Sequence, residues 1–175
     1  VHLEDSSQTT ITNGTTASAD NALVNSGAVY VYQRTGSTWA QQAYIKAANA
    51  GGGDSFGISV SLIANTLAVG ATTEDSSQTT ITNGATASAD NTVSSAGAVY
   101  VYQRTGTSWT QQAYIKAANP GSADNFGAAL SLTSDTLVVG AFGEDSNQTT
   151  ITNGTTASAN KTVGSAGAVY VYRFK

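Results

Sequence analysis

The sequence predicts an all-β fold built from about two and a half copies of a 70-residue unit. Two observations support this expectation. The segment GAVYVY returns with its first tyrosine at Tyr30, Tyr100 and Tyr170, so the unit repeats at a fixed spacing. Each unit also contains short runs that alternate in polarity or are apolar on both faces, and no run has the period of a helix.

The first two predicted strands of the unit form a hairpin. The segment FGISVSLI, residues 56–63, alternates large apolar and small residues, which is typical of a strand with one crowded face. The segment TLAVGA, residues 66–71, follows after two residues, a spacing that favours a tight hairpin turn.

The third and fourth predicted strands also lie next to each other. The segment GAVYVYQ, residues 27–33, is apolar on both faces, which indicates a strand buried between two layers. The mixed pattern of STWAQQAYIK, residues 37–46, suits an outer strand, and Gly36 can supply a positive φ in the turn between them.

Four such strands per unit predict propeller-like blades of four antiparallel strands. We expect one repeat domain, residues 1–175, with a partial blade at 1–50, a full blade at 51–120 and a partial blade at 121–175. Because a ring needs roughly 4 to 8 blades, we expect an incomplete ring. Its open apolar edges would invite self-association, unless the chain is a fragment of a longer propeller.

The second unit resembles a known repeat. Residues 54–76, DSFGISVSLIANTLAVGATTEDS, and the later GAVYVYQRTG resemble the FG-GAP repeat, the blade unit of integrin-α-like β-propellers and of many secreted bacterial proteins. The FG of the motif corresponds to Phe56-Gly57 and Phe126-Gly127, and its GA to Gly70-Ala71 and Gly140-Ala141. The resemblance implies an extracellular or cell-surface location.

The composition argues against several partners. Charged residues make up 10% of the chain, against a usual share of about 25%, and the net charge is −4. Nucleic acids and anionic membranes require a basic patch, so neither is an expected partner. No apolar run approaches the roughly 20 residues of a membrane span, so no membrane insertion is expected. The absence of cysteine excludes a disulfide scaffold.

Calcium is the one cofactor that the sequence suggests. The resemblance implies calcium binding in a loop of type DxDxDG, but the corresponding loops, IANT and TSDT, hold only Asp135. A second candidate calcium site is the repeated Glu-Asp pair, together with the aspartate at the far end of the polar segment that follows the pair. The alternative is that the pair lies at a loop entrance exposed to solvent, where aspartate caps backbone amides. The candidate ligands are Glu74, Asp75, Asp90, Glu144 and Asp145.

No catalytic site is predicted. The sole histidine, His2, has Thr72 and Phe142 at its repeat-equivalent positions. The chain contains no nucleophile elbow, zinc-binding histidine pair or phosphate-binding glycine pattern, so we do not expect an enzyme.

The polar segment at residues 6–21 recurs at 76–91 and 146–160, between the second and third strands. Its Asn13-Gly14 pair predicts a type I′ turn, and therefore a small polar hairpin or ordered arm displayed for contact; the alternative is a long disordered loop.

The expected function is a non-catalytic extracellular module for surface interaction or adhesion that self-associates. One alternative is a structural subunit of a head-to-tail assembly or fibre, completed by strand exchange. Another is a carbohydrate-binding propeller, which Trp39, Trp109 and the tyrosines would favour, although such residues more often serve in packing. The expected partners are other copies of the chain, and a cell-surface protein or glycan. The residues predicted to mediate self-association are Tyr30, Trp39, Tyr170 and Tyr172.

Overall fold

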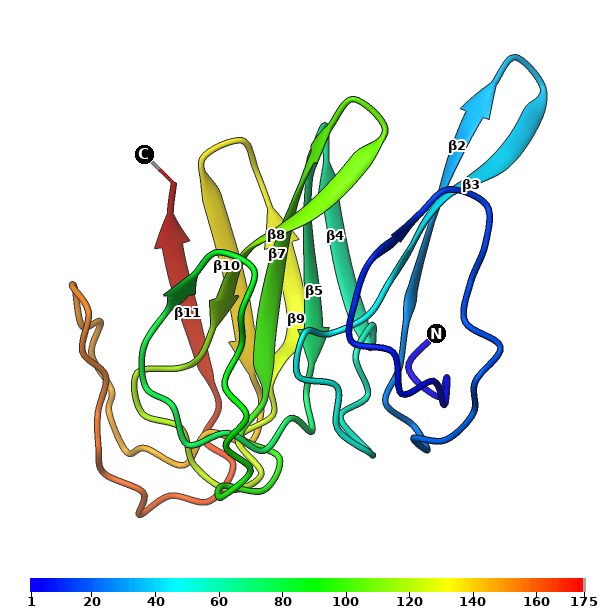
Figure 1. Ribbon diagram of the computed structural model, residues 1–175. Helices are drawn as coiled ribbons and strands as arrows, with labels where there is room; N and C mark the ends of the chain where they lie inside the picture. The colour runs from blue at the N-terminus through cyan, green and yellow to red at the C-terminus, as the bar shows by residue number, and fades with distance from the viewer. Residues whose placement is uncertain (175) are drawn as a thin grey trace.

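The chain folds into three open antiparallel sheets. The computed structural model describes residues 1–174, and within them every regular element is a strand. The sheets stand side by side in chain order (Figure 1). Lys175, the last residue of the predicted third unit, lies outside the described residues. The prediction of an all-β fold is confirmed.

The middle sheet contains the four strands expected of a complete unit and one short additional strand. Its order is β4-β5-β7-β8-β6, and all neighbours are antiparallel. The strands are β4 (Ser59–Ile63), β5 (Thr66–Ala71), β6 (Thr82–Asn83), β7 (Ala98–Thr105) and β8 (Ser108–Ile115).

The first and third sheets repeat parts of this arrangement. The first has the order β1-β3-β2, with β1 (Thr12–Asn13), β2 (Val29–Thr35) and β3 (Thr38–Ile45). The third has the order β11-β10-β9, with β9 (Phe126–Leu132), β10 (Thr136–Ala141) and β11 (Ala168–Arg173). At the spacing of 70 residues, β2 and β3 correspond to β7 and β8, and β9, β10 and β11 correspond to β4, β5 and β7.

The polar segment folds back onto its own sheet. Thr12 of β1 pairs with Tyr44 of β3, and Gly14 N donates a 2.7 Å hydrogen bond to the Gln42 carbonyl oxygen. Gly14 has φ of 115°, so the expected turn position does use the conformational freedom of glycine. The segment is therefore an ordered arm and not a separate hairpin, because the outer strand of the sheet offers unpaired backbone groups for the arm to bond.

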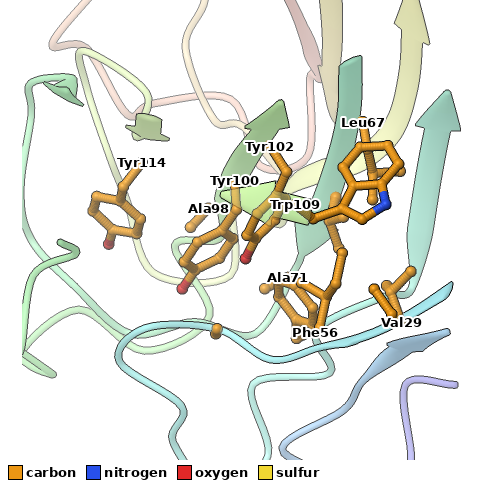
Figure 2. Close-up of a cluster of buried hydrophobic side chains, with 13 residues drawn as sticks. Val29, Phe56, Leu67, Ala71, Ala98, Tyr100, Tyr102, Trp109 and Tyr114 are labelled. Atoms are coloured by element: carbon orange, nitrogen blue, oxygen red, sulfur yellow. The ribbon is translucent and has the colours of Figure 1, made fainter. Parts of the chain in front are cut away.

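Two apolar clusters hold the three sheets together, and β7 contributes to both. Its Tyr100 and Tyr102 point into the cluster shared with the first sheet, shown in Figure 2. Its Val99 and Val101 point into the cluster shared with the third sheet. The alternation along β7 therefore makes both contacts. The burial between two layers that was predicted for residues 27–33 is found at this repeat-equivalent strand, whereas β2 itself is only partly covered, with Tyr32 54% exposed.

The Phe-Gly motif lies where adjacent sheets come closest. Phe56 forms an isolated parallel bridge with Gly27, and its ring packs edge-on against Tyr100 at a centroid distance of 5.2 Å. A Cβ at Gly27 would overlap the Phe56 carbonyl oxygen. The bridge of Phe126 with Gly97 repeats this contact between the middle and third sheets. Glycine before the third strand is therefore required by the close approach of two backbones.

Candidate functional site

Trp109 on β8 is held by two side chains of the first unit. Its indole Nε1 donates a 2.9 Å hydrogen bond to Gln42 Oε1, and its backbone N–H donates one of 2.8 Å to Asn13 Oδ1. Only 2% of Trp109 is exposed, whereas the equivalent Trp39 is 65% exposed. The arm of one unit therefore fixes the outer strand of the next unit.

The first sheet leaves an aromatic face open. Trp39 lies opposite Arg34 in the register of β2 and β3, which puts it on the same face as Tyr32, a residue that is 54% exposed. Tyr30 on this face is half-buried against the ring of Tyr44. A shallow hollow beside the edge strand β2 is lined by Val1, Val29, Tyr30 and Tyr32 of the first unit and by Gly57 and Val60 of the second. Two of the predicted self-association residues, Tyr30 and Trp39, thus border open apolar surface.

The third sheet leaves a second apolar face open. Val169 and Val171 of β11 are 69% and 62% exposed. Their repeat equivalents on β7, Val99 and Val101, are 0% and 5% exposed because the third sheet covers them. The valines at these repeat positions are therefore buried on β7 and exposed on β11.

Tyr170 and Tyr172 lie on the covered face of β11. Both rings pack edge-on against Phe126, at centroid distances of 5.2 and 6.4 Å. The prediction that these two tyrosines mediate self-association therefore needs correction, because they belong to the contact with the middle sheet. The residues that β11 exposes are Val169 and Val171.

The glutamate of each repeated Glu-Asp pair accepts hydrogen bonds inside the protein. Glu74 is fully buried; its Oε2 accepts from Lys116 Nζ at 2.7 Å, and its Oε1 accepts from the Tyr114 hydroxyl at 2.7 Å and from Asn49 Nδ2 at 3.0 Å. The first unit has the same ion pair and tyrosine contact in Glu4, Lys46 and Tyr44. The glutamates do not lie at the expected solvated loop entrance, because their lysine partners stabilise them in the interior.

The aspartates of the same pairs cap loops. Asp75 Oδ1 accepts a 2.7 Å hydrogen bond from the backbone N–H of Ser95, and Asp145 repeats this contact in the third unit. Asp90 Oδ2 accepts 2.6 Å hydrogen bonds from both the backbone N–H and the hydroxyl of Ser77, which lower the pKa of Asp90 to about 2. These three carboxylates close the ends of the arm segments.

Two buried aspartates are not among the predicted site residues. Burial raises the pKa of Asp54 to about 7; the 2.7 Å hydrogen bond from Gly51 N opposes this shift and the charge of Glu74 adds to it. Its equivalent, Asp124, has a salt bridge of 2.7 Å from Lys161 Nζ. The aspartate before each Phe-Gly motif recurs at the repeat spacing, and that recurrence could have identified the pair.

Lys161 joins two carboxylates of the third unit. Its Nζ also lies 3.2 Å from Glu144 Oε1. Burial disfavours the charged ammonium, but the hydrogen bonds and charges of Asp124 and Glu144 outweigh this cost and raise the pKa of Lys161. The second unit has Asn91 at the position of Lys161, so Asp54 lacks an equivalent cation.

The predicted calcium ligands do not form a cluster. Within residues 1–174, no group of three or more histidine, cysteine, aspartate or glutamate side chains could hold a metal ion. Glu74 and Glu144 bond to lysine ammonium groups instead. The described residues also include no helix of the length and apolarity needed to cross a membrane.

Comparison with protein families matches residues 39–85 and 109–172 to the FG-GAP repeat. The two matched segments cover more than half of the chain and include the outer strands and most of the second and third units. Comparison with curated proteins and with solved structures finds no match. The repeat spacing, the Phe-Gly bridges and the matched segments agree, and the chain belongs to the FG-GAP repeat family.

Proposed function

We propose that the chain is a non-catalytic, extracellular β-propeller module for surface interaction or adhesion, and that it associates with other copies of itself. The observation that carries this proposal is the contrast between Val169 and Val171, which are exposed, and Val99 and Val101, which an adjacent sheet covers. A face that is covered by a neighbouring unit at one place in the molecule can bind the same kind of surface at another.

The first sheet offers part of a matching surface. The sheet that covers Val99 and Val101 presents Leu137, Val139 and the Phe126 motif. The open aromatic face of the first sheet, with Tyr30 and Trp39, is the corresponding side of the first unit. Contacts of the open face of β11 with this face would join copies head to tail, and a contact that does not close on itself gives a fibre.

Self-association is tested by light scattering at micromolar concentration. We expect species heavier than a monomer, and Val171→Glu should shift them towards the monomer because a carboxylate would be buried in an apolar contact. The matched control is Ile151→Glu, which adds the same charge at a residue 90% exposed on an arm and should leave the association unchanged. A wild-type chain that stays monomeric across the concentration range would contradict the proposal, and electron microscopy distinguishes rings from fibres.

A carbohydrate-binding role is the second candidate. The observation that favours it is the exposure of Trp39 and Tyr32 on one face of β2 and β3, because flat aromatic rings can pack against the apolar faces of sugars. A glycan array compares the wild type with Trp39→Ala; binding that depends on Trp39 supports this role, and no binding at high glycan density rejects it.

A further inference from the structure

A lysine amine and an asparagine carboxamide meet at one buried carboxylate between the first and middle sheets. Glu74 Oε2 accepts a 2.7 Å hydrogen bond from Lys116 Nζ, and Glu74 Oε1 accepts one of 3.0 Å from Asn49 Nδ2. Asn49 follows β3 in the first unit, whereas Lys116 directly follows β8 in the second. The two side chains therefore come from different units and are connected by a group that can transfer protons.

The amine is set apart from water. Lys116 is 2% exposed and Glu74 is fully buried. Burial lowers the pKa of Lys116, and the charge and hydrogen bond of Glu74 offset this only in part. An uncharged amine is a nucleophile, and burial next to a base is the usual way in which proteins activate a lysine.

The carboxamide is polarised on its carbonyl side. The Tyr100 hydroxyl donates a 2.6 Å hydrogen bond to Asn49 Oδ1. Burial, together with the nearby charge of Glu74, raises the pKa of Tyr100 well above its usual value, so the phenol keeps its proton and remains a donor. A fixed donor at this oxygen stabilises the negative charge that develops there when a nucleophile adds to the carbon. The second hydrogen of Asn49 Nδ2 is donated to the Ser88 carbonyl oxygen at 2.7 Å, which fixes the orientation of the amide.

We propose that Lys116 and Asn49 form an intramolecular amide bond that covalently joins the second unit to the first. Glu74 accepts a proton from the ammonium of Lys116, and Nζ adds to Cγ of Asn49. The bond between Cγ and Nδ2 then breaks, Glu74 returns a proton to the departing nitrogen, and ammonia leaves. The Nζ–Cγ bond replaces the Cγ–Nδ2 bond, no oxidant or other reactant is needed, and the released ammonia carries away the remaining proton as ammonium.

The contact between the second and third units provides an internal comparison. Asn119 of the second unit donates to Glu144 Oε1 at 2.9 Å and accepts from the Tyr170 hydroxyl at 2.6 Å. Asn49 of the first unit makes the same contacts with Glu74 and Tyr100 of the second. The amine beside Asn119 is Lys161, which bonds to two carboxylates and is held in its charged form. A protonated amine has no lone pair for attack, so one link is expected per chain, at Lys116.

Mass spectrometry of the intact, folded chain tests the proposal. We expect a mass about 17 Da below that of the sequence, the mass of one ammonia. After digestion with trypsin, peptides 47–104 and 105–161 should appear as one linked species, because a modified Lys116 is not cleaved. A folded wild-type chain that keeps its full mass after prolonged incubation at neutral pH overturns the proposal.

Three variants identify the source of any mass loss. Lys116→Arg keeps a cation beside Glu74 but removes the nucleophilic amine, and Glu74→Gln removes the base; both should keep the full mass. The matched control Lys161→Arg should still lose one ammonia. A loss that persists in Lys116→Arg, as a cyclised Asn-Gly pair such as Asn13-Gly14 would give, also overturns the proposal. If the first two variants fail to fold, the linked wild-type peptide decides the question by itself.

Discussion

Gln42 Oε1 accepts a 2.9 Å hydrogen bond from the indole N–H of Trp109, across the contact between the first and middle sheets. The bond satisfies the one polar atom of the indole, whose ring belongs to the apolar cluster and lies 5.8 Å from the Arg104 guanidinium carbon. The equivalent Trp39 is 65% exposed. The chain therefore contains a buried and an exposed copy of the same tryptophan, which allows a matched test.

Trp109→Ala should lower the free energy of unfolding by about 3 to 5 kcal/mol, because it removes a large core side chain and leaves a cavity. Trp39→Ala should change it by no more than about 0.5 kcal/mol in the monomeric protein. Denaturant melts of both variants measure the difference, and equal losses would show that the contact between the first two sheets is not the one described.

Gly97→Ala should destabilise the protein by more than about 2 kcal/mol, because the new Cβ would overlap the Phe126 carbonyl oxygen and force the third sheet away. The control is Gly106→Ala in a hairpin turn, which also has a positive φ but no atom within 4 Å of the added Cβ. Its cost should be near 1 kcal/mol, from the backbone conformation alone. Thermal melts compare the two, and a smaller loss at Gly97 than at Gly106 would contradict the bridge.

Asp54 should make stability depend on pH near neutrality. Its pKa rises from 3.8 to about 7 on folding, so the folded state binds the proton more tightly than the unfolded state. The resulting stabilisation is complete below about pH 4 and is lost as the pH rises through 7, by on the order of a few kcal/mol. Asp54→Asn should reduce the pH dependence of the free energy of unfolding between pH 4 and 8. If the pH dependence does not change, another group causes it.

A cation at position 91 should act on Asp54 as Lys161 acts on the carboxylates of the third unit. Asn91→Lys supplies Asp54 with the cation that Lys161 gives Asp124, and should lower the pKa of Asp54. Lys161→Asn should lower the free energy of unfolding, because Asp124, which is 1% exposed, would lose its salt bridge. NMR titration of the Asp54 carboxyl carbon and denaturant melts of Lys161→Asn measure the two effects; an unchanged pKa of Asp54 together with an unchanged stability would exclude this role of Lys161.

Removing divalent cations should leave the thermal midpoint within about 1 °C, because no bound ion would be lost from the folded state. The measurement is a melt with and without EDTA, and Asp75→Asn serves as the control variant at a proposed calcium ligand. A fall of several degrees that Asp75→Asn abolishes would restore the calcium hypothesis for the Glu-Asp pairs.

The repeat and the local patterns determined much of the architecture. The spacing of GAVYVY identified the unit, and the alternation at residues 56–63 predicted a strand that the structure has as β4. Gly36 has φ of 62° at the predicted turn between β2 and β3. These features could be predicted because strand periodicity and turn chemistry depend on residues that are close in the sequence.

Tertiary structure alone decided which copy of a repeated residue is buried. Val99 and Val169 have the same neighbours in sequence but opposite exposure, because burial depends on which sheet lies against them. The glutamates of the Glu-Asp pairs were placed in solvent by their local sequence, yet Glu74 is buried with Lys116, 42 residues away. The arm likewise pairs with an outer strand that its own residues do not specify. The sequence thus determined the unit and its strands, and long-range packing determined which faces are covered, which charges are paired and where open surface remains.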